Sequence, residues 1–223
     1  MIRNFKFFGV AVTALLAMSA MAVSSASADT FQSEENKVVT LTGSQEGTDV
    51  FTVQAGEVKC SSVKYTGTQA TSPETTIKAK PTYSGCTFAG LAATVNTGVC
   101  EYVFHINDAA GDTTGTADIV CTSGEITVTA PSVGTAKCIV HVPPQNGLKT
   151  VTYKNVAGVG PTREITVEAN LSEITYSQTK GTAETGNCAT EDSKKTGTYV
   201  GKALVTGEED KAEKPNHIGI FLV

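Results

Sequence analysis

The sequence predicts an all-β protein: an antiparallel β-sandwich of immunoglobulin-like or jelly-roll-like type, stabilised by disulfides and preceded by an N-terminal signal helix. The composition favours strands and turns, with 21 glycines, abundant threonine and few strong helix formers after the leader. About a dozen short segments alternate apolar and polar residues between turn residues, as strands of a sandwich do. All six cysteines lie in the part of the chain that we expect to be exported.

The first 28 residues have the features of a secretory signal peptide. Arg3 and Lys6 form a positive N-terminal region, and residues 7–23 are largely apolar. The small residues at 26–28 match an Ala-x-Ala cleavage site before Asp29. A membrane anchor is the alternative, but polar residues interrupt the apolar run before the cleavage site. We therefore expect 1–28 to be removed on export.

The predicted strands follow one another at short spacing. By residue number they are 37–42, 50–53, 57–65, 76–83, 100–106, 116–121, 125–130, 137–142, 148–153, 163–171, 173–177, 196–206 and 217–223. We expect one large sandwich domain over 29–223. If the chain instead forms two smaller sandwiches, the boundary would lie at 143–147, where two prolines end a strand.

Within the strand at 57–65 the apolar positions change sides. Val58 and Cys60 share one side of the strand, whereas Val63 and Tyr65 share the other. A bulge at 61–62 would bring all four side chains to the same face of the sheet.

The stretch at 83–106 is the centre of the predicted core. It leaves the strand at 76–83, turns near 96–98, and returns through a strand in which Cys100, Tyr102, Phe104 and Ile106 share one face. An inward cysteine in line with two aromatic residues predicts a disulfide beside the core. The strand at 163–171 shows the same alternation without interruption.

Because exported chains keep their disulfides and the cysteine number is even, we expect three bridges. Six cysteines allow 15 pairings, and proximity along the predicted hairpins favours one of them. A metal site is less favoured, since the chain has no Cys-x-x-Cys pair. The expected pairs are Cys86 with Cys100, Cys121 with Cys138, and Cys60 with Cys188.

Several motifs resemble those of secreted proteins of unknown function from actinobacterial genomes. They are Leu-x-Gly at 41–43, Phe-Thr-x-x-x-Gly-x-x-x-Cys at 51–60, Tyr-Ser-Gly-Cys at 83–86, Gly-x-Cys-x-Tyr at 98–102 and Gly-Thr-Tyr-x-Gly at 197–201. The resemblance covers most of the chain after the leader. Its motifs consist of glycines, cysteines and aromatic residues, so it implies a shared structure and supplies no functional residues.

The charge balance argues against two classes of partner. The formal net charge is −5, and removing the leader takes away two positive charges and no negative ones. Such a chain has no electrostatic basis for binding nucleic acid or anionic lipid. The apolar C-terminus at 217–223 is too short to span a bilayer, which needs about 20 residues. Any partner is therefore expected at the cell envelope or outside the cell.

Candidate chemical groups are few, and no motif predicts a cofactor. His105 and His141 lie on the outward side of their strands and could meet to bind a metal, although two unrelated surface histidines are the simpler interpretation. Asn107, Asp108 and Asp112 could contribute oxygens to calcium, but three donors fall short of a calcium shell.

We expect a non-enzymatic protein with a structural or binding role at the cell surface or in the medium. The chain has no Gly-x-Ser-x-Gly motif, and every cysteine is expected to be bridged. The alternative is a secreted hydrolase with an active site assembled from loop residues such as Asp108, Asp112 and His217.

Overall fold

The computed structural model describes residues 29–107, 113–131, 137–180, 195–209 and 216–223, and most of these residues lie in strands. The signal helix predicted for 1–28 lies outside the described residues. Within the described ranges, no helix has the length and apolar character needed to cross a membrane.

The described part contains fifteen β-strands and two 3-10 helices. The strands are β1 (Phe31–Ser33), β2 (Val39–Gln45), β3 (Asp49–Val53), β4 (Gly56–Gln69), β5 (Thr76–Phe88), β6 (Leu91–Asn96), β7 (Cys100–Ile106), β8 (Thr114–Cys121), β9 (Ile126–Pro131), β10 (Lys137–Val142), β11 (Gln145–Val156), β12 (Glu164–Lys180), β13 (Lys195–Glu209), β14 (His217–Ile218) and β15 (Ile220–Leu222). The 3-10 helices are η1 (Glu34–Asn36) and η2 (Gly160–Thr162).

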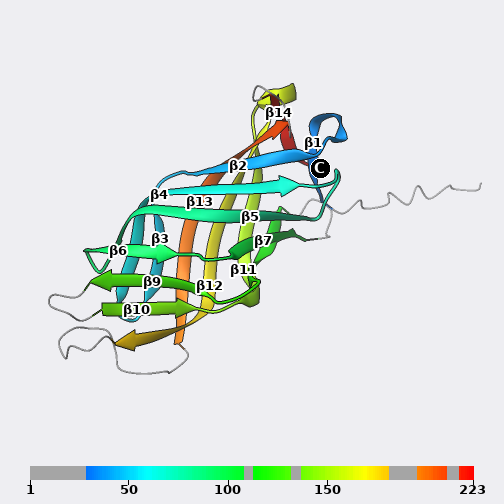
Figure 1. Ribbon diagram of the computed structural model, residues 1–223. Helices are drawn as coiled ribbons and strands as arrows, with labels where there is room; N and C mark the ends of the chain where they lie inside the picture. Colours follow the sequence, from blue (N-terminus) through cyan, green and yellow to red (C-terminus); the bar gives the residue numbers. More distant parts are fainter. Residues whose placement is uncertain (1–28, 108–112, 132–136, 181–194, 210–215) are drawn as a thin grey trace, which may run out of the picture.

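Four long strands, β4, β5, β12 and β13, close the main sheet on itself. At one level they form a ring in the order β2–β4–β5–β7–β8–β11–β12–β13, and β13 pairs with β2 again. At the next level they form a second ring with β3, β6, β9 and β10. All of these pairings are antiparallel. In Figure 1, β4 and β5 cross the front of the view, and β12 and β13 run behind them at a steep angle.

The alternation of side chains places one apolar face of every strand inside the closed sheet. On β12 the inward residues Ile165, Val167, Ala169 and Leu171 are all buried, as the sequence predicts. On β7, Cys100 and Ile106 are buried, and the aromatic residues between them pack against the same core.

The long strands bend where they pass from one ring to the other. The ladder between β12 and β13 shifts register between Leu171 and Ile174, where Glu173 has a φ of +60°. The two strands predicted at 163–171 and 173–177 are therefore one strand with a bulge. On β4 the inward side also changes between Cys60 and Val63, as the sequence predicts. The ladder with β5 keeps its register from Cys60–Cys86 to Ser62–Ser84, so it does not contain the one-residue bulge predicted at 61–62. Bulges bend a strand and increase its twist, which the change of ring requires.

The prediction of an antiparallel all-β fold is confirmed, whereas a sandwich of immunoglobulin-like or jelly-roll-like type is not. Apart from a two-stranded sheet of β1 and β15, the hydrogen-bonded pairings of the described strands run around one continuous sheet of thirteen strands. Both architectures need strands with one apolar and one polar face, so the alternation in the sequence does not distinguish them.

Disulfides are present, but the predicted pairing is wrong. Cys60 is bonded to Cys86, and Cys100 to Cys121. Each pair joins residues that face one another on neighbouring strands, β4 with β5 and β7 with β8. Cys86 does not meet Cys100 because β7 pairs with the beginning of β5, whereas Cys86 lies near the end of β5.

The pair Cys121–Cys138 is excluded in the same way, since Cys121 is bonded to Cys100. Cys138 is itself disulfide-bonded. Cys188 lies outside the described residues. Disulfides are typical of proteins that work in an oxidising environment.

Removing either described bridge should destabilise the fold, because the unfolded chain without the bridge has more conformational entropy. The bridges close segments with sequence separations of 26 and 21 residues. For segments of this length the chain-entropy contribution is about 3.5 kcal/mol. The double variant Cys60→Ala/Cys86→Ala should lose this amount in urea unfolding. The control is Lys59→Ala/Thr87→Ala, the adjacent outward pair on the same strands, which should lose less than about 1 kcal/mol. Equal losses in the two variants would contradict the prediction.

Candidate functional site

The closed sheet surrounds a cavity of about 120 Å³ that is partly open to solvent. Each strand from β2 to β13 contributes at least one side chain or backbone group to its wall. Most of the lining is aliphatic, and it comes from residues far apart in the sequence. Representative members are Leu41, Ile77, Ile119, Val128, Val167 and Leu171.

Four tyrosines give the cavity a polar region. Tyr65 on β4, Tyr83 on β5, Tyr102 on β7 and Tyr199 on β13 all line it. Each stands on the inward side of its strand, for the same reason that the neighbouring aliphatic residues do. All four rings are half-buried, and burial is the main cause that raises the pKa of each hydroxyl group.

The carboxyl group of Asp49 lies among these hydroxyls. Asp49 is only 3% exposed and begins β3. Its position follows from the sheet: along β13, the ladder with β3 ends at Val200 and the ladder with β2 begins at Ala203. In this gap the backbone N–H of Lys202 has no ladder partner on that side, and it donates to Asp49 Oδ1 at 3.3 Å.

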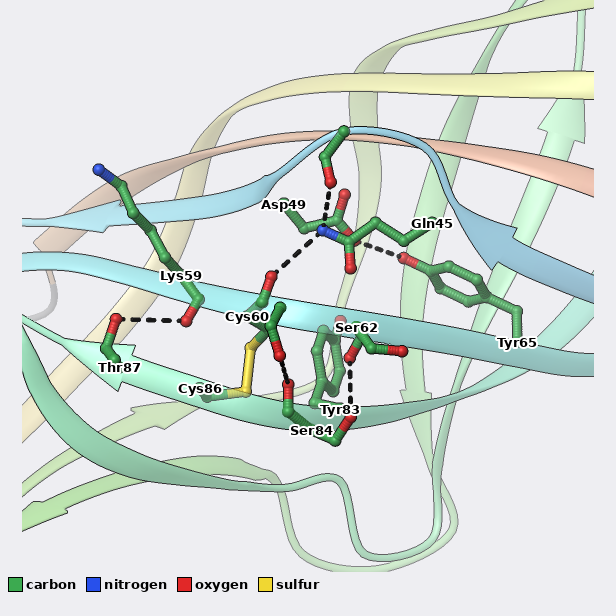
Figure 2. Close-up of a disulfide and its surroundings, with 12 residues drawn as sticks. Gln45, Asp49, Lys59, Cys60, Ser62, Tyr65, Tyr83, Ser84, Cys86 and Thr87 are labelled. Atoms are coloured by element: carbon green, nitrogen blue, oxygen red, sulfur yellow. Dashed lines mark hydrogen bonds between the residues drawn. A yellow bond between two sulfur atoms is a disulfide. The ribbon is translucent and has the colours of Figure 1, made fainter.

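Two tyrosine hydroxyls complete the surroundings of the carboxyl group. Tyr65 Oη donates to Asp49 Oδ2 at 3.2 Å, and Tyr199 also donates to this carboxyl group. The Tyr65 and Tyr199 oxygens are 3.2 Å apart. Figure 2 shows the side chains of Gln45, Asp49 and Tyr65 converging beside the Cys60–Cys86 disulfide. The Gln45 amide donates to the carbonyl of Cys60, and its own buried carbonyl oxygen has no hydrogen-bond partner among the described residues.

The other two tyrosines form a second hydroxyl pair. The Tyr83 and Tyr102 oxygens are 2.6 Å apart, so one hydroxyl donates to the other. Burial is the main cause that raises the pKa of both, and it raises the pKa of Tyr102 to about 12. The charge of Asp49 adds to the shift in each case, which places this carboxyl group within electrostatic reach of both pairs.

Burial also raises the pKa of Asp49, although the hydrogen bonds from Tyr199, Lys202 and Tyr65 oppose this shift. The ammonium group of Lys202 does not compensate the carboxylate. It forms ion pairs with Glu46 at 3.1 Å and Glu168 at 3.8 Å and is 42% exposed. Within the part of the chain that the structure describes, the hydrogen bonds that Asp49 receives therefore come from neutral donors.

Glycine at position 201 makes room for this group. A Cβ atom there would lie 2.4 Å from the Tyr199 hydroxyl and 2.6 Å from Asp49 Oδ1. The motif Gly-Thr-Tyr-x-Gly at 197–201 thus supplies both a tyrosine of the cavity and the space beside it.

The two histidines predicted on outer faces do not meet. His105 on β7 is bonded through Nε2 to Asp118 at 2.9 Å and through Nδ1 to Thr76 at 3.3 Å. His141 lies on β10, which is not a neighbour of β7 in the sheet. Among the described residues, no group of three or more His, Cys, Asp or Glu side chains could hold a metal ion.

His141 has a carboxylate and a hydroxyl on opposite sides of its ring. Its Nδ1 lies 2.5 Å from Glu125 Oε1, and its Nε2 lies 2.9 Å from Thr179 Oγ1. None of these three residues lines the cavity.

The loop residues of the alternative hydrolase are not brought together by the described structure. Asp108 and Asp112 lie outside the described residues. His217 begins β14 and is exposed, opposite Glu208 on β13. The tyrosines and Asp49 were not predicted as a site, although Tyr83, Tyr102 and Tyr199 belong to the motifs that carry the family resemblance.

No protein-family model, curated protein or solved structure matches the chain. The chemistry of the cavity is therefore argued from its own residues. An apolar wall with one cluster of hydroxyl and carboxyl groups is suited to bind a small molecule in a fixed orientation.

The buried tyrosines should make stability fall at alkaline pH. The pKa of Tyr102 is raised from 10.0 to about 12, so the unfolded chain releases this proton first. The free energy of unfolding should be insensitive to this group below about pH 10 and should fall as pH rises from 10 to 12. Urea unfolding at each pH, with tyrosinate absorbance of the folded protein, measures both effects. The variant Tyr102→Phe should show a shallower fall. Titration of every tyrosine near its ordinary pKa in the folded protein would contradict this prediction.

Proposed function

We propose that the protein is exported and binds a small, largely apolar molecule inside its closed sheet, without converting it chemically. The observation that carries this proposal is the cavity of about 120 Å³ with apolar walls and one polar cluster. A closed ring of about eight strands has an interior wide enough either to be filled by side chains or to hold one small ligand. Here the side chains leave space.

Export is supported by the leader and by the disulfides. Residues 1–28 have the charge, apolar run and cleavage site of a signal peptide, and the described bridges suit an oxidising compartment. We place the mature protein, residues 29–223 as a single domain, in the medium or at the cell surface. Its ligand would then come from outside the cell or from the envelope.

Filling the cavity should abolish binding. Ala79 on β5 lines the cavity and is half-buried, so Ala79→Leu directs extra atoms into the space. Calorimetry with toluene and ethylbenzene should show saturable binding to the wild-type protein, and the variant should bind about tenfold or more weakly. The control is Ala92→Leu, an exposed position of β6 outside the lining, which should bind as the wild type does. If neither apolar compound binds the wild-type protein, the proposal fails.

The secreted hydrolase remains the second candidate because of the arrangement around His141. Catalytic triads have the same arrangement: a carboxylate contacts Nδ1 of an imidazole, and the hydroxyl nucleophile contacts Nε2. Here the hydroxyl would be that of Thr179. This site differs from the loop residues expected from the sequence, and it lies on the outer face of the sheet.

A covalent probe separates the two candidates. We expect a fluorophosphonate to leave the wild-type protein unlabelled. If this site is catalytic, the wild-type protein is labelled at Thr179, and His141→Ala lowers the labelling rate by about 100-fold or more because the base is lost. Labelling with this dependence would replace binding by catalysis as the preferred function.

A further inference from the structure

We infer that the molecule bound in the cavity is a protonated amine with a small apolar body, and that Asp49 and the tyrosine hydroxyls hold its ammonium group. This inference rests on the proposed function and specifies the chemical class of the ligand.

The carboxylate of Asp49 has no positively charged hydrogen-bond partner among the described residues. Asp49 is 3% exposed, and among the described residues its hydrogen-bond donors are two tyrosine hydroxyls and the backbone N–H of Lys202. A buried carboxylate without a cation is costly, and proteins normally pair such a charge. The ammonium group of Lys202, whose backbone N–H Asp49 accepts, forms ion pairs with Glu46 and Glu168. A cationic ligand would supply the missing charge.

The polar cluster of the cavity offers hydrogen-bond acceptors to an ammonium group. An ammonium group has three N–H donors and no acceptor, so it needs several oxygen atoms around it. An ionised carboxylate has about four lone-pair sites, of which three are used here by Tyr65, Tyr199 and Lys202. The tyrosine oxygens themselves can accept further hydrogen bonds.

A metal ion and an anion fit the polar cluster less well than an amine does. A metal ion would need several strong ligands, and no cluster of three His, Cys, Asp or Glu side chains occurs in the described residues. Neutral hydroxyls around one carboxylate suit a monovalent organic cation, and tyrosine rings are favourable neighbours for such a charge. A negatively charged ligand would be repelled by Asp49.

The volume of the cavity limits the size of the ligand. By the measure of 10–15 Å³ for each water molecule, a cavity of about 120 Å³ has room for roughly ten waters or a ligand of similar size. Benzylamine is an appropriate probe, and ethylbenzene and benzyl alcohol match its number of non-hydrogen atoms without its charge.

Calorimetry with these three compounds tests the inference. The wild-type protein near neutral pH should bind benzylamine about tenfold or more tightly than ethylbenzene, with benzyl alcohol between them. Asp49→Asn should remove the preference for the amine, so that benzylamine binds no more tightly than benzyl alcohol. The control Asp118→Asn, on the outer face of β8, should keep the preference.

A measurement on the unmodified protein covers the case in which Asp49→Asn does not fold. Benzylamine stays protonated in the acidic range, so its affinity should fall as pH decreases through the titration of Asp49, whereas that of ethylbenzene should not. Equal affinity for the three compounds, or no such pH dependence, would overturn the inference while the binding proposal stands. Absence of binding by all three would overturn both.

Discussion

Closure of the sheet is the constraint on which the rest of this structure depends. Because β4, β5, β12 and β13 take part in both rings, residues from both rings line one cavity. Closure also pairs the edges that an open sheet would expose to other chains. The bends at Glu173 and between Cys60 and Val63 are then requirements of the fold, since a straight strand could not serve both rings.

The polar cluster lies where the two rings meet. β2 and β3 both pair with β4 and β13, and the chain reversal between them leaves a short gap in each ladder. At the gap on β13, Asp49 accepts a hydrogen bond from the backbone N–H of Lys202. The interruption that closure imposes on the sheet is therefore also what brings a carboxyl group into an otherwise apolar interior. Such a group costs stability unless it is paired, and that cost is the physical basis for expecting a ligand there.

The sequence contained part of the signal for this site. Tyr83, Tyr102 and Tyr199 stand in the glycine- and cysteine-containing motifs and on the apolar side of predicted strands, so their burial could be predicted. That the three side chains line the same cavity could not be predicted, because they belong to three strands whose pairing no local sequence pattern indicates. Asp49 was missed for another reason: it precedes the predicted strand at 50–53 by one residue, and the side of a residue at a strand boundary is not fixed by alternation. The error in disulfide pairing has the same origin, since the hairpin assumed between Cys86 and Cys100 is not a local pair.

What the amino-acid sequence determined by itself is the local geometry: strands throughout, one apolar face on each, a change of side in β4 and a strand end before Pro143. These follow from the two-residue period of extended chain and from the steric limits of single residues. Only the tertiary structure decided which strands are neighbours, and with them the closed sheet, the cysteine pairs and the meeting of Asp49 with four tyrosines. Those choices depend on contacts between distant segments, such as Gln45 with Ala203, whose energies depend on how all the strands pack together.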